Sequence, residues 1–238
     1  MRIADRARTL FKQAKQQKRR ALDEPTAKRI LDLYGIRTPR SAVVDGATAS
    51  DAMLRDLGGR VVVKLISPDV LHKSDFGGVA LGVEDAAGLR AAMDAMSQRC
   101  REHGYRVEGF LLEEQIQEGH EIVIGGFQDP SFGPVIMLGL GGIFVEILKD
   151  VSFRICPITR TDALEMLGEL RGAALLRGAR GRPPVPDDVV TGALLAVGGE
   201  NGLFFELADQ IGELDVNPLI VSAQGAIALD ARVVLVSE

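Results

Sequence analysis

The stretch of sequence that decides the fold is VVVKLISPDVLHKSDFGGVALGV, residues 61–83. Its first part, Val61–Leu65, is a mostly apolar run rich in β-branched residues, which is typical of a buried strand. Residues 67–78 are polar and contain proline and glycine, which indicates a loop. A second strand is predicted at residues 79–83. The stretch therefore predicts two strands joined by a long polar loop that carries a histidine.

Strand and helix signals alternate on both sides of this loop. Helices are predicted after the capping residues Asp23, Ser50, Asp85 and Thr161, and over residues 187–196. Further strands are predicted near residues 42–44, 110–114, 121–127, 135–138, 144–148, 212–221 and 226–235. Strands and helices in this order predict an α/β or α+β layer.

Composition and charge exclude several classes of protein. The chain has 238 residues and a net charge of −5, so binding to nucleic acid through bulk positive charge is not expected. No apolar run approaches the roughly 20 residues that a membrane span requires. The two cysteines, Cys100 and Cys156, lie far apart and form no CxxC pair, so we expect buried, reduced thiols in a cytoplasmic protein.

The first twenty residues differ from the rest of the chain. They contain eight Lys or Arg residues and one acid. A helical arrangement would place five apolar residues on one face, namely Ile3, Ala7, Leu10, Phe11 and Ala14. We predict a basic amphipathic helix over residues 1–20 that docks on a partner or on its own domain, and a solvated, frayed arm is the alternative.

Two residues of the strand and the loop could handle phosphate. Lys64 ends the apolar strand, where a charge requires an anion or a carboxylate partner, so it is either a phosphate ligand or a lysine whose ammonium group reaches solvent. His72 lies in the polar loop, close to Gly77 and Gly78. An imidazole titrates near neutral pH and can carry a phosphoryl group as a nucleophile, although most loop histidines are idle surface groups.

Carboxylates and one amide form two further candidate sites. Glu113 and Glu121 flank a polar turn and could accept hydrogen bonds from a ribose and an adenine amine, or bind a cation. Two exposed acids at strand edges are the simpler alternative. Asp215 and Asn217 are two residues apart, so they project from one face of a strand, and Asp230 lies on the predicted hairpin partner. Oxygen ligands grouped in this way suit Mg²⁺, with water and phosphate completing the octahedron.

Three motifs in this order resemble one family. They are KLISPDVLHKSD followed by GGV (residues 64–75 and 77–79), GLGGIFVE (139–146) and DVNPL (215–219). Together they resemble the ADP-forming acetyl- and acyl-CoA synthetases over about residues 22–233, with the basic arm outside the likeness. The resemblance implies an α+β ATP-grasp fold, in which two lobes close on a nucleotide. We therefore expect a first lobe at residues 21–115 that carries the phosphohistidine loop, and a second at residues 116–238 that carries the Mg²⁺ site.

The resemblance also implies a mechanism and roles for individual residues. The ATP-grasp part exchanges a phosphoryl group between ATP or ADP and a mobile histidine, here His72, and Asp215 would orient or stabilise the phosphoimidazole. Asn217 and Asp230 match magnesium ligands of the family. The nucleotide-binding residues implied in the same way are Lys64, Glu113 and Glu121, with Glu146 and Arg154 as weaker candidates.

A partner is implied as well. In this family a partner subunit or domain binds CoA and makes acyl phosphate through its own phosphohistidine, and no such unit is present in this sequence. We therefore expect the β-subunit of a hetero-oligomer with a CoA-binding α-subunit, acting on acyl-CoA or carboxylate and phosphate. Two alternatives stay open, a catalytically silent ATP-binding regulatory module and an ATP-grasp carboxylate–amine ligase, and neither requires His72. All three would share one fold, so the fold alone does not decide between them.

Overall fold

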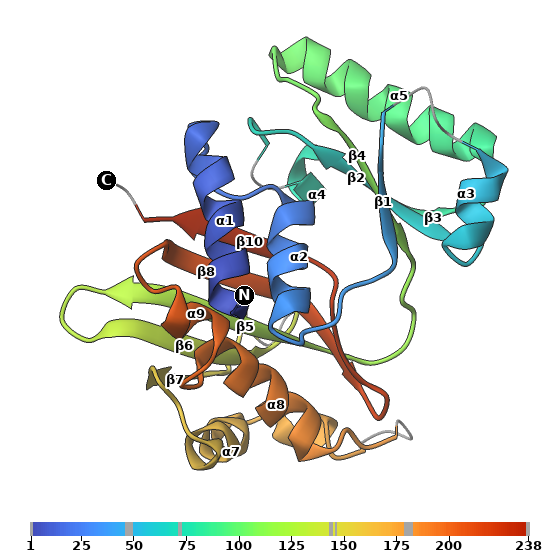
Figure 1. The fold of residues 1–238 in the computed structure, drawn as a ribbon. Coiled ribbons are helices and arrows are strands. Elements are labelled where there is room, and N and C mark those ends of the chain that lie inside the picture. The colour runs from blue at the N-terminus through green and yellow to red at the C-terminus, as the bar shows by residue number, and fades with distance from the viewer. Residues whose placement is uncertain are drawn as a thin grey trace. The chain divides into compact units, whose positions relative to one another are not determined.

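The computed structural model describes residues 2–45, 50–70, 73–142, 145, 147–178 and 183–236. Two predicted site residues, His72 and Glu146, lie outside these described residues. The chain divides into two compact units, whose elements are labelled in Figure 1. Residues 39–117 form one, which we call the inserted unit, and residues 1–38 together with 118–238 form the other, which we call the discontinuous unit.

This division differs from the expected lobes at residues 21–115 and 116–238. The seam in the middle of the chain lies close to the expected position. Residues 21–38, however, group with the C-terminal part of the chain. The reason is that Leu22 donates its backbone N–H to the carbonyl oxygen of Val233 and packs in the apolar core of the discontinuous unit.

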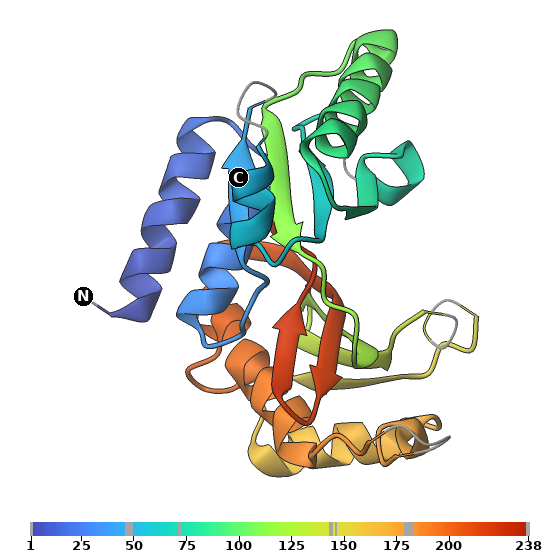
Figure 2. The same ribbon diagram turned by 90° about the vertical axis from the view of Figure 1, so that its right-hand side faces the viewer.

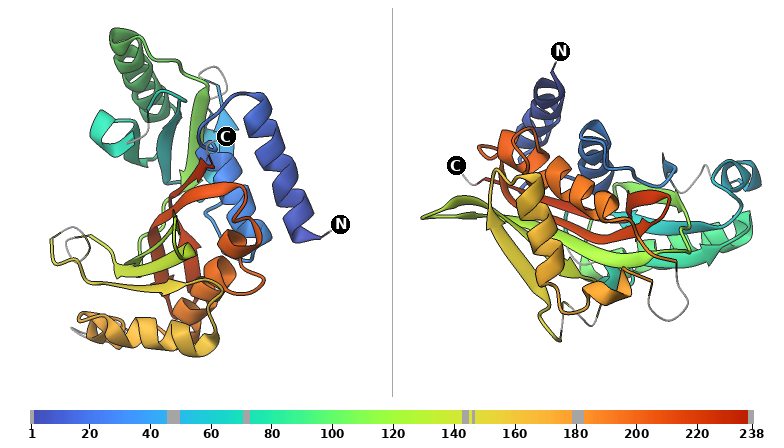
Figure 3. Two further views of the ribbon diagram at one scale, coloured as in Figure 1. Left: turned by 90° about the vertical axis from the view of Figure 1, so that its left-hand side faces the viewer. Right: turned by 90° about the horizontal axis from the view of Figure 1, so that it is seen from below.

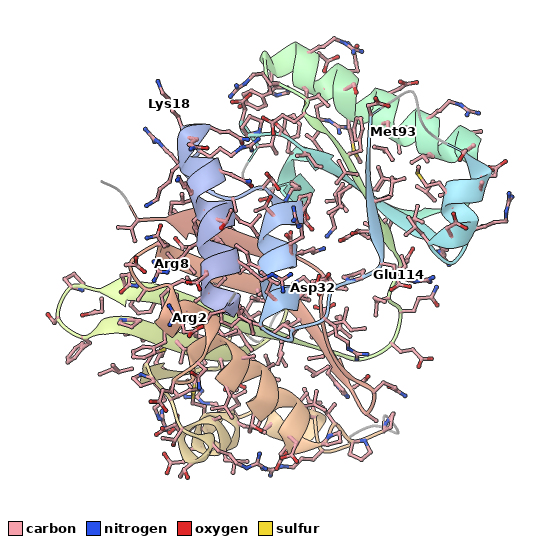
Figure 4. The ribbon with its side chains drawn as sticks, in the orientation of Figure 1. Arg2, Arg8, Lys18, Asp32, Met93 and Glu114 are labelled. Atoms are coloured by element: carbon pink, nitrogen blue, oxygen red, sulfur yellow. The ribbon has the colours of Figure 1, made fainter. Side chains whose placement is uncertain are left out.

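A four-stranded antiparallel sheet forms the inserted unit, in the order β1-β4-β2-β3. Its elements are β1 (Ser41–Val44), α3 (Asp51–Asp56), β2 (Val61–Ile66), α4 (Lys73–Phe76), β3 (Val79–Val83), α5 (Ala86–His103) and β4 (Gly109–Glu114). Val61, Val63 and Leu65 alternate along β2 and are fully buried in one core with residues of α5, among them Met93, which is labelled in Figure 4. Since side chains alternate along a strand, Lys64 lies on the opposite face.

The discontinuous unit contains a six-stranded sheet in the order β10-β8-β5-β6-β7, with β9 paired to β8 as a hairpin (Figure 2). Its strands are β5 (His120–Asp129), β6 (Gly133–Leu140), β7 (Val151–Ile155), β8 (Ile211–Ser222), β9 (Gly225–Ala228) and β10 (Ala231–Leu235). Its helices are α1 (Ile3–Gln16), α2 (Glu24–Leu33), α7 (Arg160–Glu169), α8 (Asp187–Gly198), α9 (Leu203–Glu206) and the 3₁₀ turn Ala173–Leu175.

Helices of this unit share one apolar core with one face of its sheet (Figure 3). Ile122 and Ile124 of β5 lie in that core, and a Cβ atom added at Gly126 would meet the Phe204 ring of α9 at 2.9 Å. Even-numbered residues of this part of β5 therefore face the helices. Odd-numbered residues, among them Gly125, point to the opposite side, which we call the far face.

The basic N-terminal segment packs on its own unit. In α1, Ala4, Ala7, Phe11 and Ala14 are buried, so the predicted amphipathic helix is present and is not a solvated arm. Arg8, labelled in Figure 4, donates to both carboxylate oxygens of Asp209 at 2.6 and 2.8 Å. Since Phe11 is fully buried within the unit, it does not belong to a surface for a partner.

Three local features of the discontinuous unit differ from the predictions. The cap of α7 is Thr159 rather than Thr161, because Thr159 forms a capping box with Asp162. The strand predicted near residues 144–148 is not found at residues 147–148, which form a turn, and β7 follows at residues 151–155 instead. The segment 226–235 is two strands rather than one. These two strands, β9 and β10, are separated by a corner at residues 229–230, and this corner carries Asp230.

Both cysteines are buried and free, as the sequence predicts. Burial raises the pKa of the Cys156 thiol to about 12, so it does not act as a thiolate near neutral pH. None of the helices in the described part of the chain is long and apolar enough to cross a membrane.

Candidate functional site

Lys64 and Glu113 form a buried ion pair in the inserted unit. The ammonium nitrogen of Lys64 lies 2.9 Å from a carboxylate oxygen of Glu113, and their side chains are 9% and 2% exposed. Strands β2 and β4 pair antiparallel with Lys64 opposite Leu111, so Glu113 is two residues along on the same face. Strand β2 continues to Ile66, so Lys64 lies inside the apolar strand and not at its end as predicted. Its charge has the carboxylate partner that such a position requires.

The loop after Lys64 is held at both described ends. At its start, Arg106 donates its backbone N–H and its guanidinium group to the Asp69 carboxylate. At its end, the guanidinium group of Arg99 on α5 donates to the Gly77 carbonyl oxygen at 2.7 Å. Residues 73–76 form the short helix α4 instead of a plain loop. His72 lies between these anchors, outside the described residues, so its predicted role stays a prediction.

In the discontinuous unit, the strand register places Asp215 on the far face. Asp215 pairs with Gly125 of β5 on one side and with Arg232 of β10 on the other. The register between β5 and β8 shifts by one residue near Asn217–Pro218, which leaves an extra residue on β8. Such a bulge re-aims side chains, and its sequence signal is a proline within a strand. Asn217 is exposed on the same side as Asp215.

Asp230 lies in the corner between β9 and β10, which places it next to Asn217. The backbone N–H of Asn217 donates to the Asp230 carbonyl oxygen at 3.3 Å. One carboxylate oxygen of Asp230 accepts from the Ala231 N–H at 2.7 Å, which fixes its orientation. The three residues expected to lie together, Asp215, Asn217 and Asp230, are therefore brought together by β8 and the corner that precedes β10.

Negative charge accumulates at this place. Burial raises the pKa of Asp215, and the carboxylates of Asp230 and Glu213 raise it further. The guanidinium group of Arg232 and a hydrogen bond with the Asn217 side chain act in the opposite direction. Arg232 was not singled out from the sequence, and only the strand register, which sets it beside Asp215, identifies it.

The donor set fits a hard divalent cation in part. Asp230 and Asn217 offer oxygen ligands beside excess negative charge, which suits Mg²⁺. Within the described ranges, no group of three His, Cys, Asp or Glu residues could hold a metal by itself. Any Mg²⁺ bound here would therefore take further oxygens from water and from a phosphate-bearing ligand, which is how proteins usually hold this ion.

Glu121 lies near the start of β5, next to the glycine-rich segment at the end of β6. Glu121 is exposed, and it is four residues from Gly125, so roughly 13 Å of strand separates it from the level of Asp215. The Gly141 N–H donates to the Glu121 carbonyl oxygen at 2.8 Å, and a Cβ atom at Gly141 would lie 2.7 Å from that of Glu121. Only glycine allows this approach, which explains why the segment after β6 contains it.

Arg154 is not brought to the far face. It pairs with Ile136 of β6, which lies in the helix-covered core, and its guanidinium group contacts Glu165 and Glu169 of α7. Because β7 was missed from the sequence, the side to which Arg154 points was missed as well. Glu146, the other weak candidate, lies outside the described residues, so only Lys64, Glu113, Glu121, Asp215, Asn217 and Asp230 stay as located candidates.

The known proteins that this chain resembles belong to one family. A family model described as an ATP-grasp domain matches residues 13–235, so the likeness reaches farther toward the N-terminus than the motifs alone indicate. The β-subunit of acetate–CoA ligase [ADP-forming] I of Pyrococcus furiosus is 40% identical over 232 residues, 97% of this chain and 98% of that one. Acetate–CoA ligase [ADP-forming] I of Archaeoglobus fulgidus is 39% identical over 88% of this chain, which spans 30% of that longer protein.

A solved structure shows the same fold with ligands. It is the dinucleotide-forming acetyl-coenzyme A synthetase 1 of Candidatus Korarchaeum cryptofilum in complex with coenzyme A and Mg-AMPPCP, with its phosphohistidine segment pointing towards the nucleotide-binding site. Its matched chain is 34% identical, with a TM-score of 0.81, and the match covers 97% of this chain and all of that one. By fold, sequence and length, this chain belongs to the ATP-grasp family and, within it, to the β-subunits of the ADP-forming acyl-CoA ligases.

Proposed function

We propose that this chain is the nucleotide-binding β-subunit of an acyl-CoA synthetase and moves a phosphoryl group between ATP or ADP and His72. The observation that carries the proposal is the meeting of Asp215, Asn217 and Asp230 beside excess negative charge. Among the described side chains that act on Asp215, Arg232 is the one cation, beside the carboxylates of Asp230 and Glu213. A magnesium–nucleotide complex would supply both the cation and the remaining oxygen ligands.

The chemical step balances without any redox partner. In the direction that makes ATP, a terminal oxygen of ADP attacks the phosphorus of phosphohistidine. The bond between phosphorus and ring nitrogen breaks, and the ring leaves as neutral imidazole with its other N–H retained. Asp215 is proposed to accept a hydrogen bond from that N–H, which fixes the ring and its tautomer. Asn217 and Asp230 would hold Mg²⁺, which when bound would supply positive charge beside the phosphates.

The nucleotide is assigned to the remaining candidates. Glu121 lies far enough along β5 from Asp215 to accept from the ribose or the base while the phosphates lie near Asp230. Lys64 carries a positive charge for phosphate, and Glu113 holds it in place when no phosphate is bound. Arg154 has no part in this assignment, because it faces α7.

The full reaction requires a CoA-binding α-subunit. The Pyrococcus furiosus relative is named as one subunit, and the Archaeoglobus fulgidus relative contains this region as less than a third of a longer chain. We therefore propose an α/β hetero-oligomer in which the partner makes acyl phosphate from acyl-CoA. Co-purified with a candidate α-subunit, the chain should release phosphate from ATP only with both acid and CoA. Acyl-CoA formation by the pure chain alone would contradict this assembly.

The test of the phosphoryl carrier is labelling with γ-labelled Mg·ATP, alone and with the α-subunit. We expect one acid-labile, base-stable label that maps to His72 and is absent from His72→Ala. The control is His103→Ala, which removes an exposed histidine from the same unit and should label normally. Label retained in His72→Ala would overturn the assignment. Absence of any label would favour the silent regulatory module or the carboxylate–amine ligase.

A further inference from the structure

A second buried ion pair lies in the discontinuous unit, on α2. The ammonium nitrogen of Lys28 is 2.9 Å from a carboxylate oxygen of Glu24, one helical turn away, and their side chains are 5% and 2% exposed. Neither residue belongs to the motifs or to the candidate site. Removing two charges from water is costly, and an apolar pair of similar volume often serves folding equally well. The pair therefore calls for an explanation beyond packing.

Lys28 uses a second contact to hold a piece of backbone 201 residues away. Its ammonium group donates to the carbonyl oxygen of Leu229 at 2.6 Å. Leu229 belongs to the corner between β9 and β10 and directly precedes Asp230. A hydrogen bond from a charged donor is stronger than one between neutral groups, especially away from water. Lys28 thus fixes the peptide unit that leads into the proposed metal ligand.

The same corner is tied to β8 at the other metal ligand. Leu229 donates its N–H to the carbonyl oxygen of Pro218 at 2.9 Å, and Asn217 donates its N–H to the carbonyl oxygen of Asp230. Lys28, Leu229 and the bulged part of β8 therefore form one chain of contacts. A displacement of the Leu229 peptide would move Asp230 relative to Asn217, and Mg²⁺ tolerates little departure from its octahedral geometry.

We propose that Glu24 and Lys28 are positioning residues, which hold the β9–β10 corner so that Asn217 and Asp230 meet one divalent cation. Glu24 holds the ammonium group of Lys28 in place, and Lys28 holds the Leu229 carbonyl. This inference rests on the proposed function, since it assigns the support of the metal ligands named there. It also gives α2 a supporting role in the site, although none of the proposed metal ligands lies on this helix.

The test uses a double variant, Glu24→Met/Lys28→Met, in the full chain. Removing both charges avoids leaving either charge of the pair buried opposite an apolar group, and only the hydrogen bond to the Leu229 carbonyl is lost by design. We therefore expect a melting temperature close to that of the wild type. ADP binding is measured by calorimetry with Mg²⁺ and with EDTA. The affinity with Mg²⁺ should fall about tenfold to a hundredfold, as for other groups that orient metal ligands, whereas the affinity in EDTA should not change. Amide hydrogen exchange of a peptide over residues 226–232 should become faster without nucleotide.

The matched control is Arg37→Gln. The Arg37 side chain also donates to a backbone carbonyl oxygen, that of Gln224 at 2.8 Å. Gln224 lies in the turn between β8 and β9, at the other end of β9 from Asp230. We expect it to leave the Mg²⁺ dependence of ADP binding unchanged. Unchanged Mg²⁺ dependence and unchanged exchange in the double variant would overturn the positioning role. A wild-type chain whose ADP affinity ignores Mg²⁺ would overturn the proposed function instead, and the exchange measurement would still decide whether the pair holds the corner.

Discussion

The two units of this molecule differ in whether the charged side chains on their sheets are neutralised by other side chains. In the inserted unit, Lys64 and Glu113 are almost completely buried and neutralise each other. In the discontinuous unit, Asp215 and Asp230 lie together with Glu213 nearby, and Arg232 is the cation beside them that the structure describes. One site is balanced by its own side chains, whereas the other carries an excess of negative charge.

The difference separates what maintains the fold from what awaits a ligand. A balanced buried pair contributes little net stability, yet removing one partner leaves the other charge uncompensated. An unbalanced cluster of carboxylates lowers stability until a cation binds, and the binding energy of that cation then includes relief from repulsion. Removing one member of the buried pair should therefore lower stability. Removing a carboxylate of the cluster should raise the stability of the ligand-free chain or weaken its binding of a cation.

The largest effect is expected in the inserted unit. Lys64→Met removes the ammonium group that faces the buried Glu113 carboxylate and should lower the free energy of unfolding by about 3–5 kcal/mol. Urea unfolding followed by circular dichroism measures the change. The control is Lys64→Met/Glu113→Met, which should recover most of the loss. A single variant as stable as the wild type would show that Lys64 is not needed to compensate the Glu113 carboxylate.

An intermediate effect is expected at the metal corner. Asp230→Ala should weaken Mg²⁺-dependent ADP binding by at least about tenfold, or about 1.4 kcal/mol, since it removes a direct ligand. Calorimetry with and without Mg²⁺ measures it. Asp188→Asn removes a negative charge from the exposed start of α8 in the same unit and serves as the control. Equal affinities for Asp230→Ala and the wild type would exclude Asp230 as a ligand.

The pH dependence of stability sharpens the comparison. Burial raises the pKa of Asp215 above its value in the unfolded chain, so its contribution favours folding below the unfolded pKa of about 3.9 and is lost as pH rises through the folded pKa. Asp215→Asn should therefore be more stable than the wild type at neutral pH without Mg²⁺, and the difference should vanish at acidic pH. Denaturant unfolding at both pH values tests this, and a variant less stable at neutral pH would contradict it.

The smallest effect is expected for an exposed pair, which shows what burial adds. Arg8 and Asp209 have side chains that are 40% and 56% exposed, so Arg8→Met should cost only roughly 0.2–1 kcal/mol. The hydrogen bond from Arg8 lowers the pKa of Asp209 to about 2, so the wild type loses this contribution as pH falls from about 4 to about 2. Thermal unfolding across this range should show the loss in the wild type and not in Arg8→Met.

Short-range signals predicted most elements of the fold. Asp23, Ser50 and Asp85 cap helices as expected, because an N-cap depends on a few adjacent residues. The strand at residues 79–83 matches β3 at both ends. The grouping of Asp215, Asn217 and Asp230 was also predictable, since two positions share a strand face and the third follows on the paired strand.

Long-range pairing could not be predicted from the same signals. Which unit receives residues 21–38 depends on contacts with strands near the end of the chain, such as that of Leu22 with Val233. The side to which Arg154 points depends on β7, whose five residues mix polar and apolar types and carry no clear strand pattern. Lys28 carries no motif, and its contact with Leu229 spans nearly the whole sequence.

The packing of the N-terminal segment on the last strands has a consequence for synthesis on the ribosome. Residues 39–117 are contiguous, so the inserted unit can fold as soon as they have emerged. Helices α1 and α2 emerge earlier, but the backbones of Arg20 and Leu22 form hydrogen bonds with Leu235 and Val233 of β10, which follows every other described element along the chain. Until then the apolar core to which Phe11 belongs is incomplete, and apolar surface exposed on a nascent chain is prone to aggregation and is bound by chaperones.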